Sequence, residues 1–193
     1  LPEISQLAAD IRASLSDKYP SSFSHNRYAA TEDYLSKSAA AFAYYDGPLK
    51  HFECRSFLDL EGLSKHRHLL ESRPPKTELH QRLRQYGNIK FSFSLDFGSY
   101  RDLQRQRSAV QEMPLLTTKH GFHTWYLDQL TPELRRFVVS VLREQESRIA
   151  ALGLSSVDAQ YYVAIGYVVP VEITCPLPAA VYIAELRSSD AVH

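Results

Sequence analysis

Three closely spaced arginines have the chemistry to bind an anion. Arg101, Arg105 and Arg107 come directly after a segment with the pattern of a β-strand. Helical spacing beyond Gly98 places Arg101, Arg105 and Ser108 on one face of a predicted helix. Arg107 lies beside that face. The planar guanidinium group donates paired hydrogen bonds to phosphates and carboxylates and matches them better than lysine does. The spacing therefore predicts an anion site, and the alternative is an ordinary solvated helix face.

The strand that must position these arginines is predicted over residues 89–97. Side chains alternate between apolar and polar along this segment. A period of two places the apolar set on one face of the strand and the polar set on the other, so one face must be buried. The apolar set is Ile89, Phe91, Phe93, Leu95 and Phe97, and the polar set is Lys90, Ser92, Ser94 and Asp96.

Two close pairs of histidines raise the question of a metal site. His66 and His68 are two residues apart, and His120 and His123 are three apart, so each pair can share one face of a strand or helix. No carboxylate-rich motif accompanies either pair, and Gly121 disfavours a rigid helix between the second pair. We therefore predict no metal site and interpret these histidines as polar surface or hydrogen-bonded residues.

The arginine run resembles the signature of the flavin-dependent thymidylate synthases. In that family an alternating strand leads into a helix with the motif R-H-R-x-x-S-x-N-E-x-S-x-R-Y. Arg105 and Arg107 match the outer arginines, and Gln106 takes the place of the central histidine. Glu112 lies one residue earlier than the glutamate of the motif, and the later Ser and Arg-Tyr have no counterpart here. The resemblance is therefore to a family member with an altered site.

Further matches extend this resemblance over roughly residues 76–192. His80 is the one match to the upstream family box H-x-[ST]-P-[FL]-E-H, and Arg187 matches an arginine that contacts the pyrimidine in the family. Gly166 stands where the family has an arginine for the nucleotide phosphate. An asparagine and an arginine that help to hold the flavin are replaced by prolines. These prolines are Pro176 and Pro178.

The resemblance implies a homotetramer with FAD at subunit interfaces. It also implies dUMP as substrate, methylenetetrahydrofolate as one-carbon donor and NADPH as reductant, with methylation of dUMP to dTMP as the reaction. In such enzymes arginines polarise the uracil, and the flavin carries the redox chemistry. The resemblance assigns cofactor binding to His80, Arg105, Gln106 and Arg107, substrate binding to Arg107, Glu112 and Arg187, and catalysis to Arg187.

Two functional hypotheses follow from the matches and the mismatches. The first is a methyltransferase of the flavin-dependent thymidylate synthase type with an altered site. The second is a catalytically degenerate domain of the same fold that binds another anionic ligand or serves as an oligomerisation module. The replacements at Gln106, Gly166, Pro176 and Pro178 favour the second hypothesis.

Composition places the chain among globular proteins. It has 193 residues, of which 44% are apolar, and 22 basic residues balance 22 acidic ones. This balance predicts no nucleic-acid or membrane partner, and a nucleotide or other anionic small molecule would bind at a local site. Two cysteines, expected to be buried, and no signal sequence favour the cytoplasm. We expect a single domain over residues 1–193 that forms a homo-oligomer. The chain starts at Leu1 rather than at Met, which is consistent with a piece of a longer protein.

Periodicity and capping signals predict an α+β fold with a small antiparallel sheet and several helices, resembling the fold of the flavin-dependent thymidylate synthases. Thr131 and Pro132 form the strongest helix start. The apolar stripe of this helix is expected to be buried and consists of Leu134, Phe137, Val138, Val141 and Leu142. Pro170 predicts that the strand around residues 167–171 lies at a sheet edge. Further helices are expected over residues 4–15, from Thr31 to about 46, over 55–71, 76–86, from 156, and over 178–187.

Overall fold

The computed structural model describes residues 2–23 and 28–188, and its contacts divide the chain into two units, Leu1–Phe42 and Ala43–His193. In the first unit α1 (Pro2–Lys18) confirms the first predicted helix and is followed by α2 (Pro20–Phe23). The next helix, α3 (Ala29–Ala41), begins before Thr31, so the predicted cap at Thr31 is wrong. The last residues of the family resemblance, 189–192, lie outside the described residues.

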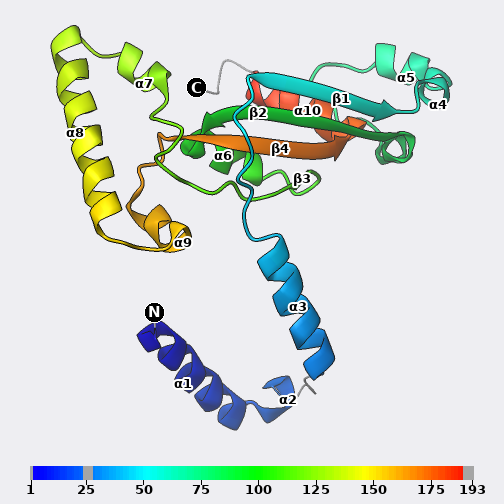
Figure 1. Ribbon diagram of the computed structural model, residues 1–193. Coiled ribbons are helices and arrows are strands. Elements are labelled where there is room, and N and C mark those ends of the chain that lie inside the picture. The colour runs from blue at the N-terminus through cyan, green and yellow to red at the C-terminus, as the bar shows by residue number, and fades with distance from the viewer. Residues whose placement is uncertain (1, 24–27, 189–193) are drawn as a thin grey trace. The chain divides into compact units, whose positions relative to one another are not determined.

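One antiparallel sheet organises the described part of the second unit. Its four strands have the order β1-β2-β4-β3, as Figure 1 shows. The strand expected over residues 89–97 is confirmed as β2 (Gly87–Asp96), which pairs with β1 (Phe52–Leu58) on one side and β4 (Val168–Pro176) on the other. β3 (Val110–Gln111) pairs with β4. The predicted α+β class with a small antiparallel sheet is therefore confirmed.

Two of these strands differ from the sequence-based predictions. β1 occupies the start of the segment 55–71, which was predicted to be one helix. Pairing along the whole of β1 with β2 decides this segment, because strand preference depends on neighbours more than on local pattern. β4 is an interior strand and not the predicted edge strand. Proline is tolerated there because β3 pairs only with Thr174 and Ile173, which leaves the β3 side of β4 open at Pro170.

The second unit also contains short helices and one long helix, α8 (Pro132–Ala151). The predicted helix over residues 76–86 is reduced to one short 3-10 helix, because only residues 81–86 are helical. No helix within the described ranges 2–23 and 28–188 is long and apolar enough to cross a membrane. The helices are α4 (Leu60–Ser64), α5 (Arg67–Glu71), η1 (Gln81–Tyr86), α6 (Phe97–Gln104), α7 (Thr124–Asp128), α8 (Pro132–Ala151), α9 (Ser156–Ala159), η2 (Gln160–Tyr162) and α10 (Leu177–Arg187).

Helix α8 begins as predicted, and its predicted apolar stripe is buried only in part. The Thr131 hydroxyl accepts a hydrogen bond from the Leu134 amide at 3.4 Å, and Pro132 occupies the first turn. Leu134, Phe137 and Val141 are exposed, so the prediction of burial is wrong for these three residues. Leu142 packs against the core as predicted, and Glu146 one turn further on accepts a hydrogen bond from the buried Tyr167 hydroxyl at 2.8 Å.

The hydrophobic core lies on the face of the sheet covered by α6 and α10. Val169, Val171 and Ile173 of β4 are almost fully buried there. They pack with Tyr100 of α6, whose hydroxyl has its pKa raised by burial to about 12. Cys175 is buried as expected, and burial raises its thiol pKa to about 11. Cys54 is exposed on the edge strand β1, which corrects the expectation that both cysteines are buried.

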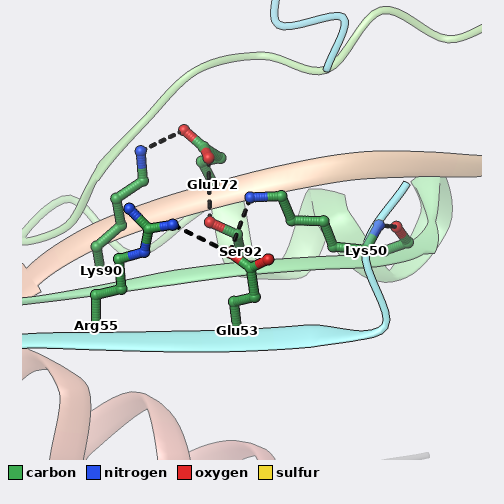
Figure 2. A network of polar contacts seen from close by, with 7 residues as sticks. Lys50, Glu53, Arg55, Lys90, Ser92 and Glu172 are labelled. Carbon is green, nitrogen blue, oxygen red and sulfur yellow. Dashed lines mark hydrogen bonds and ion pairs between the residues drawn. The ribbon is translucent and has the colours of Figure 1, made fainter. Parts of the chain in front are cut away.

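The opposite face of the sheet carries a network of charged and hydroxyl side chains (Figure 2). Glu172 of β4 pairs with Lys90 at 2.6 Å and accepts a hydrogen bond from the Ser92 hydroxyl at 3.0 Å. On β1, Glu53 pairs with Lys50 at 2.9 Å and lies 3.8 Å from Arg55. The hydrogen bond from Lys90 lowers the pKa of Glu172, against the opposing effect of burial, and Ser92 lowers it further.

We expect Glu172→Gln to destabilise the protein at neutral pH and to have a smaller effect in acid. Because the folded-state pKa is lowered, the stabilisation is fully present above the unfolded glutamate value of about 4.3 and is lost as the pH falls through the folded value. Urea unfolding of parent and variant at neutral pH and below about pH 4 measures this difference.

The control for this prediction is Glu144→Gln on α8, which removes an exposed pair with Arg148. Exposed pairs contribute little to stability, so this variant should show almost no difference from the parent at either pH. A pH trend of the same size in both variants would contradict the role assigned to Glu172.

Candidate functional site

A cleft of about 320 Å³ lies where η1, the turn after α6 and the start of α10 meet. Gln106 and Ser108 line it from the turn between α6 and β3. Arg84 lines it from η1, and Tyr182 lines it from α10. The remaining lining residues are Glu78, Gln81, Pro176, Pro178 and Ala179.

The early end of α6 keeps Arg105 and Arg107 out of the cleft. The helix ends at Gln104, and the following turn is closed by hydrogen bonds from the Gln106 amide to Leu103 and from the Ala109 amide to Gln106. This turn directs Gln106 to the cleft and leaves Arg105 and Arg107 exposed. The predicted alignment of Arg101, Arg105 and Ser108 on one helix face is therefore wrong, because the helix stops too early.

Asp102 of α6 brings together two of the predicted arginines. Arg187 Nη2 donates to the Asp102 carbonyl oxygen at 2.8 Å, and its Nη1 donates to Asp102 Oδ2 at 3.3 Å. Arg105 Nε lies 3.8 Å from Asp102 Oδ1, with 76% of its side chain exposed. Arg105 and Arg187 thus share one carboxylate, but neither residue lines the cleft. The Nε of Arg187 is buried and has no hydrogen-bond partner among the described residues.

His80 and Glu112 lie outside the cleft and have local structural contacts. His80 caps η1, because its Nδ1 accepts a hydrogen bond from the Arg82 amide at 3.2 Å. The carbonyl oxygen of Glu112 accepts a hydrogen bond from the Tyr100 hydroxyl at 3.0 Å, while the residue is exposed. Of the predicted site residues, Gln106 alone lines the cleft.

Sequence reasoning missed the polar residues that η1 and the segment before it contribute. Gln81 accepts a hydrogen bond from Arg84 Nη1 at 3.4 Å and donates to Glu78, and all three residues line the cleft. Nothing in their local sequence distinguishes them from a solvated segment. Tyr182 could have been found, because it lies four residues after Pro178 and therefore on the same face of α10.

A smaller hollow of about 140 Å³ adjoins the cleft and shares Glu78, Pro178 and Tyr182 with it. Glu185 lies at its edge and pairs with Arg73. The hydrogen bond from Arg73 lowers the pKa of Glu185. Among the described residues, no group of three or more His, Cys, Asp or Glu side chains is placed to hold a metal ion.

Comparison with known proteins finds relatives over about half of the chain. No family model matches. A UPF0159 protein of Chlamydia pneumoniae is 34% identical over 109 residues, which are 54% of this chain and 20% of that protein. A UPF0159 protein of Thermoplasma acidophilum is 32% identical over 108 residues, which are 55% of this chain and 22% of that protein. The match spans about a fifth of the relatives' length, and their names state no activity.

Proposed function

We propose that the second unit is a flavin-dependent thymidylate synthase-like domain whose cleft binds a flavin or another phosphorylated planar molecule. The observation that carries this proposal is the composition of the cleft. Three segments far apart in sequence, residues 78–84, 106–108 and 176–182, line it together. The family resemblance assigns flavin contacts to the neighbourhood of each of these segments. Their meeting in one cleft supports a ligand site derived from the family's cofactor site.

The side chains of the cleft fit one half of FAD. Arg84 is a cation for a phosphate, since it forms no ion pair with a carboxylate among the described residues. Gln106 and Ser108 add amide and hydroxyl donors, and the half-exposed ring of Tyr182 is a surface for stacking. The volume of about 320 Å³ is near the lower end for ligand pockets, so a dinucleotide would extend beyond the cleft. Homo-oligomerisation would supply the remaining contacts, and bound FAD would supply redox chemistry.

For methylation of dUMP, Arg187 would have to leave Asp102 to polarise the pyrimidine. It is held there by two hydrogen bonds, at 2.8 and 3.3 Å. This contact favours the second candidate, a catalytically degenerate domain that binds a ligand or assembles with other copies. NADPH and methylenetetrahydrofolate take part only if Arg187 is released and turnover occurs.

The purified protein should contain flavin, or should bind added FAD. We expect Arg84→Ala to weaken FAD binding by about 1.5–3 kcal/mol, the usual value of a hydrogen bond to a charged group. Quenching of flavin fluorescence during titration measures the affinity. Arg101→Ala is the matched control, because it removes the same charge from an exposed position outside the cleft.

Two results would contradict this proposal. The first is a colourless protein that binds neither added FAD nor dUMP. The second is an equal loss of FAD affinity in Arg84→Ala and Arg101→Ala, which would show that Arg84 acts only through its general positive charge. Arg187→Ala should leave flavin affinity unchanged. If dUMP is then bound by the parent but not by Arg187→Ala, the enzyme hypothesis is preferred over the degenerate one.

A further inference from the structure

A second cleft opens on the polar side of the sheet, and it shares no lining residue with the candidate cleft. Its volume is about 370 Å³. Small-molecule pockets typically measure about 300–1,000 Å³. The segment before β1, Ser94 of β2, Val168 of β4 and the loop that leads into α7 surround it. A ligand of the second cleft would therefore not compete for the residues to which we assign flavin binding.

Imidazole groups dominate the polar lining of the second cleft. His51, His120 and His123 all contribute to it, and no carboxylate does. Lys50 also lines the cleft, but its ammonium group is paired with Glu53 at 2.9 Å, as Figure 2 shows. The imidazoles are consequently the groups left to hold a ligand, and they can donate hydrogen bonds to an anion.

His120 carries a buried polar atom. Its Nε2 has no hydrogen-bond partner among the described residues. Burial lowers the pKa of His120, the positive charge of Lys119 lowers it further, and Asp46 opposes this shift. Buried polar atoms are nearly always hydrogen-bonded, so a ligand atom or a water is expected at this nitrogen.

The hydrogen bonds of His123 make its other nitrogen a donor. Its Nδ1 accepts a hydrogen bond from the Trp125 amide at 3.2 Å. In the neutral ring the proton must then lie on Nε2, which can donate it to a ligand. Thr124, the next residue, also lines the cleft. Polar residues therefore come from two separate segments of the chain, since His51 precedes β1.

Apolar side chains complete the lining and limit the kind of ligand. Leu49, Phe122 and Val168 contribute them. We propose that the second cleft binds a small molecule that carries a phosphate or carboxylate group on a compact apolar body. The imidazoles and hydroxyls would hold the anionic group, and the apolar side chains would cover the body of the ligand.

Titration of the full chain with phenyl phosphate tests this proposal. Phenyl phosphate combines an anionic group with a compact ring, and the imidazole signals of the protein in NMR spectra report its binding. We expect the signals of His51, His120 and His123 to shift with a single affinity, and phenol, which lacks the anion, to leave them in place. Benzoate in parallel distinguishes a carboxylate ligand from a phosphate ligand.

Two variants and one control localise the binding. His51→Ala changes an exposed residue, and His120→Leu removes the unpartnered nitrogen. Each should weaken the binding of phenyl phosphate or benzoate about tenfold, which corresponds to about 1.4 kcal/mol. His68→Ala on α5 removes an exposed imidazole elsewhere and should change nothing. The proposal is overturned if millimolar concentrations of both anions leave the imidazole signals unchanged, or if phenol binds as well as the anions do. It is also overturned if Arg84→Ala abolishes the binding of the anions while the histidine variants do not.

Discussion

Replacing Asp96 by alanine is expected to lower the free energy of unfolding by about 3 kcal/mol. This buried carboxylate accepts several hydrogen bonds, and each bond to a charged group contributes about 1.5–3 kcal/mol. The contributions are not additive, because the bonds share one side chain. Its Oδ1 accepts from the Ser99 amide at 2.9 Å and from the Tyr126 hydroxyl at 3.1 Å. Its Oδ2 accepts from the Ser99 hydroxyl at 2.6 Å, and the residue is only 6% exposed. Urea unfolding followed by circular dichroism measures the loss.

Asp59 offers a matched control for the loss of the helix cap alone. It caps α4 by accepting a hydrogen bond from the Gly62 amide at 2.9 Å, but it is exposed and no contact comparable to that with Tyr126 is found for it among the described residues. Asp59→Ala should therefore cost about 1 kcal/mol, the usual value of a cap. Equal losses in the two variants would show that burial and the hydrogen bonds from Tyr126 and the Ser99 hydroxyl add nothing to the cap at Asp96.

The contacts of Asp96 separate what the sequence could predict from what it could not. Alternation along β2 correctly placed Asp96 on the polar face, and a carboxylate just before a helix is a recognisable cap. Tyr126 lies 30 residues further along the chain, and no local pattern connects the two. The cap at Thr131 is likewise a signal confined to one element and was confirmed, whereas the cap predicted at Thr31 was not.

Elements that depend on distant partners were predicted poorly. The segment that forms β1 has apolar spacing compatible with a helix, and its pairing with β2 decides its conformation. On α8 the sequence predicts one apolar stripe but does not indicate which of its residues meet the core. Leu142 of this stripe packs against the core, and the nearby Glu146 accepts a hydrogen bond from Tyr167. The other end of the stripe, with Leu134 and Phe137, is exposed.

The candidate site depended on one helix end that the sequence does not mark. No glycine or proline occurs in the residues directly after Gln104, so the helical spacing was extended to Arg105 and Ser108. The sequence did contain a signal for the ion pair at Asp102, because Asp102 and Arg105 are three residues apart. The contact of Asp102 with Arg187 spans 85 residues and was outside the reach of such spacing rules.

The Gly166→Arg substitution introduces the arginine that the family resemblance places at this position. We expect it to destabilise the protein by at least about 3 kcal/mol. Overpacking a core costs about 1–3 kcal/mol, and burying an unpaired charge adds to this cost. Gly166 is buried, and a Cβ atom there would lie 2.4 Å from the ring of Phe122. That ring is held edge-on against Tyr167, with ring centroids 5.4 Å apart. The midpoint of urea unfolding gives the change in stability.

A double-mutant cycle identifies Phe122 as the cause. Gly166→Ala should cost about 2 kcal/mol in the parent, because its methyl group meets the ring, and much less once Phe122→Ala has removed that ring. Additive losses would place the strain elsewhere, for example in the hydrogen bond from the His123 amide to the Gly166 carbonyl oxygen at 2.9 Å. If the cycle shows the expected coupling, Phe122 occupies the space that an arginine would need. Arginine at position 166 could then reach a nucleotide phosphate only after Phe122 had also changed, so this departure from the family pattern involves two residues rather than one.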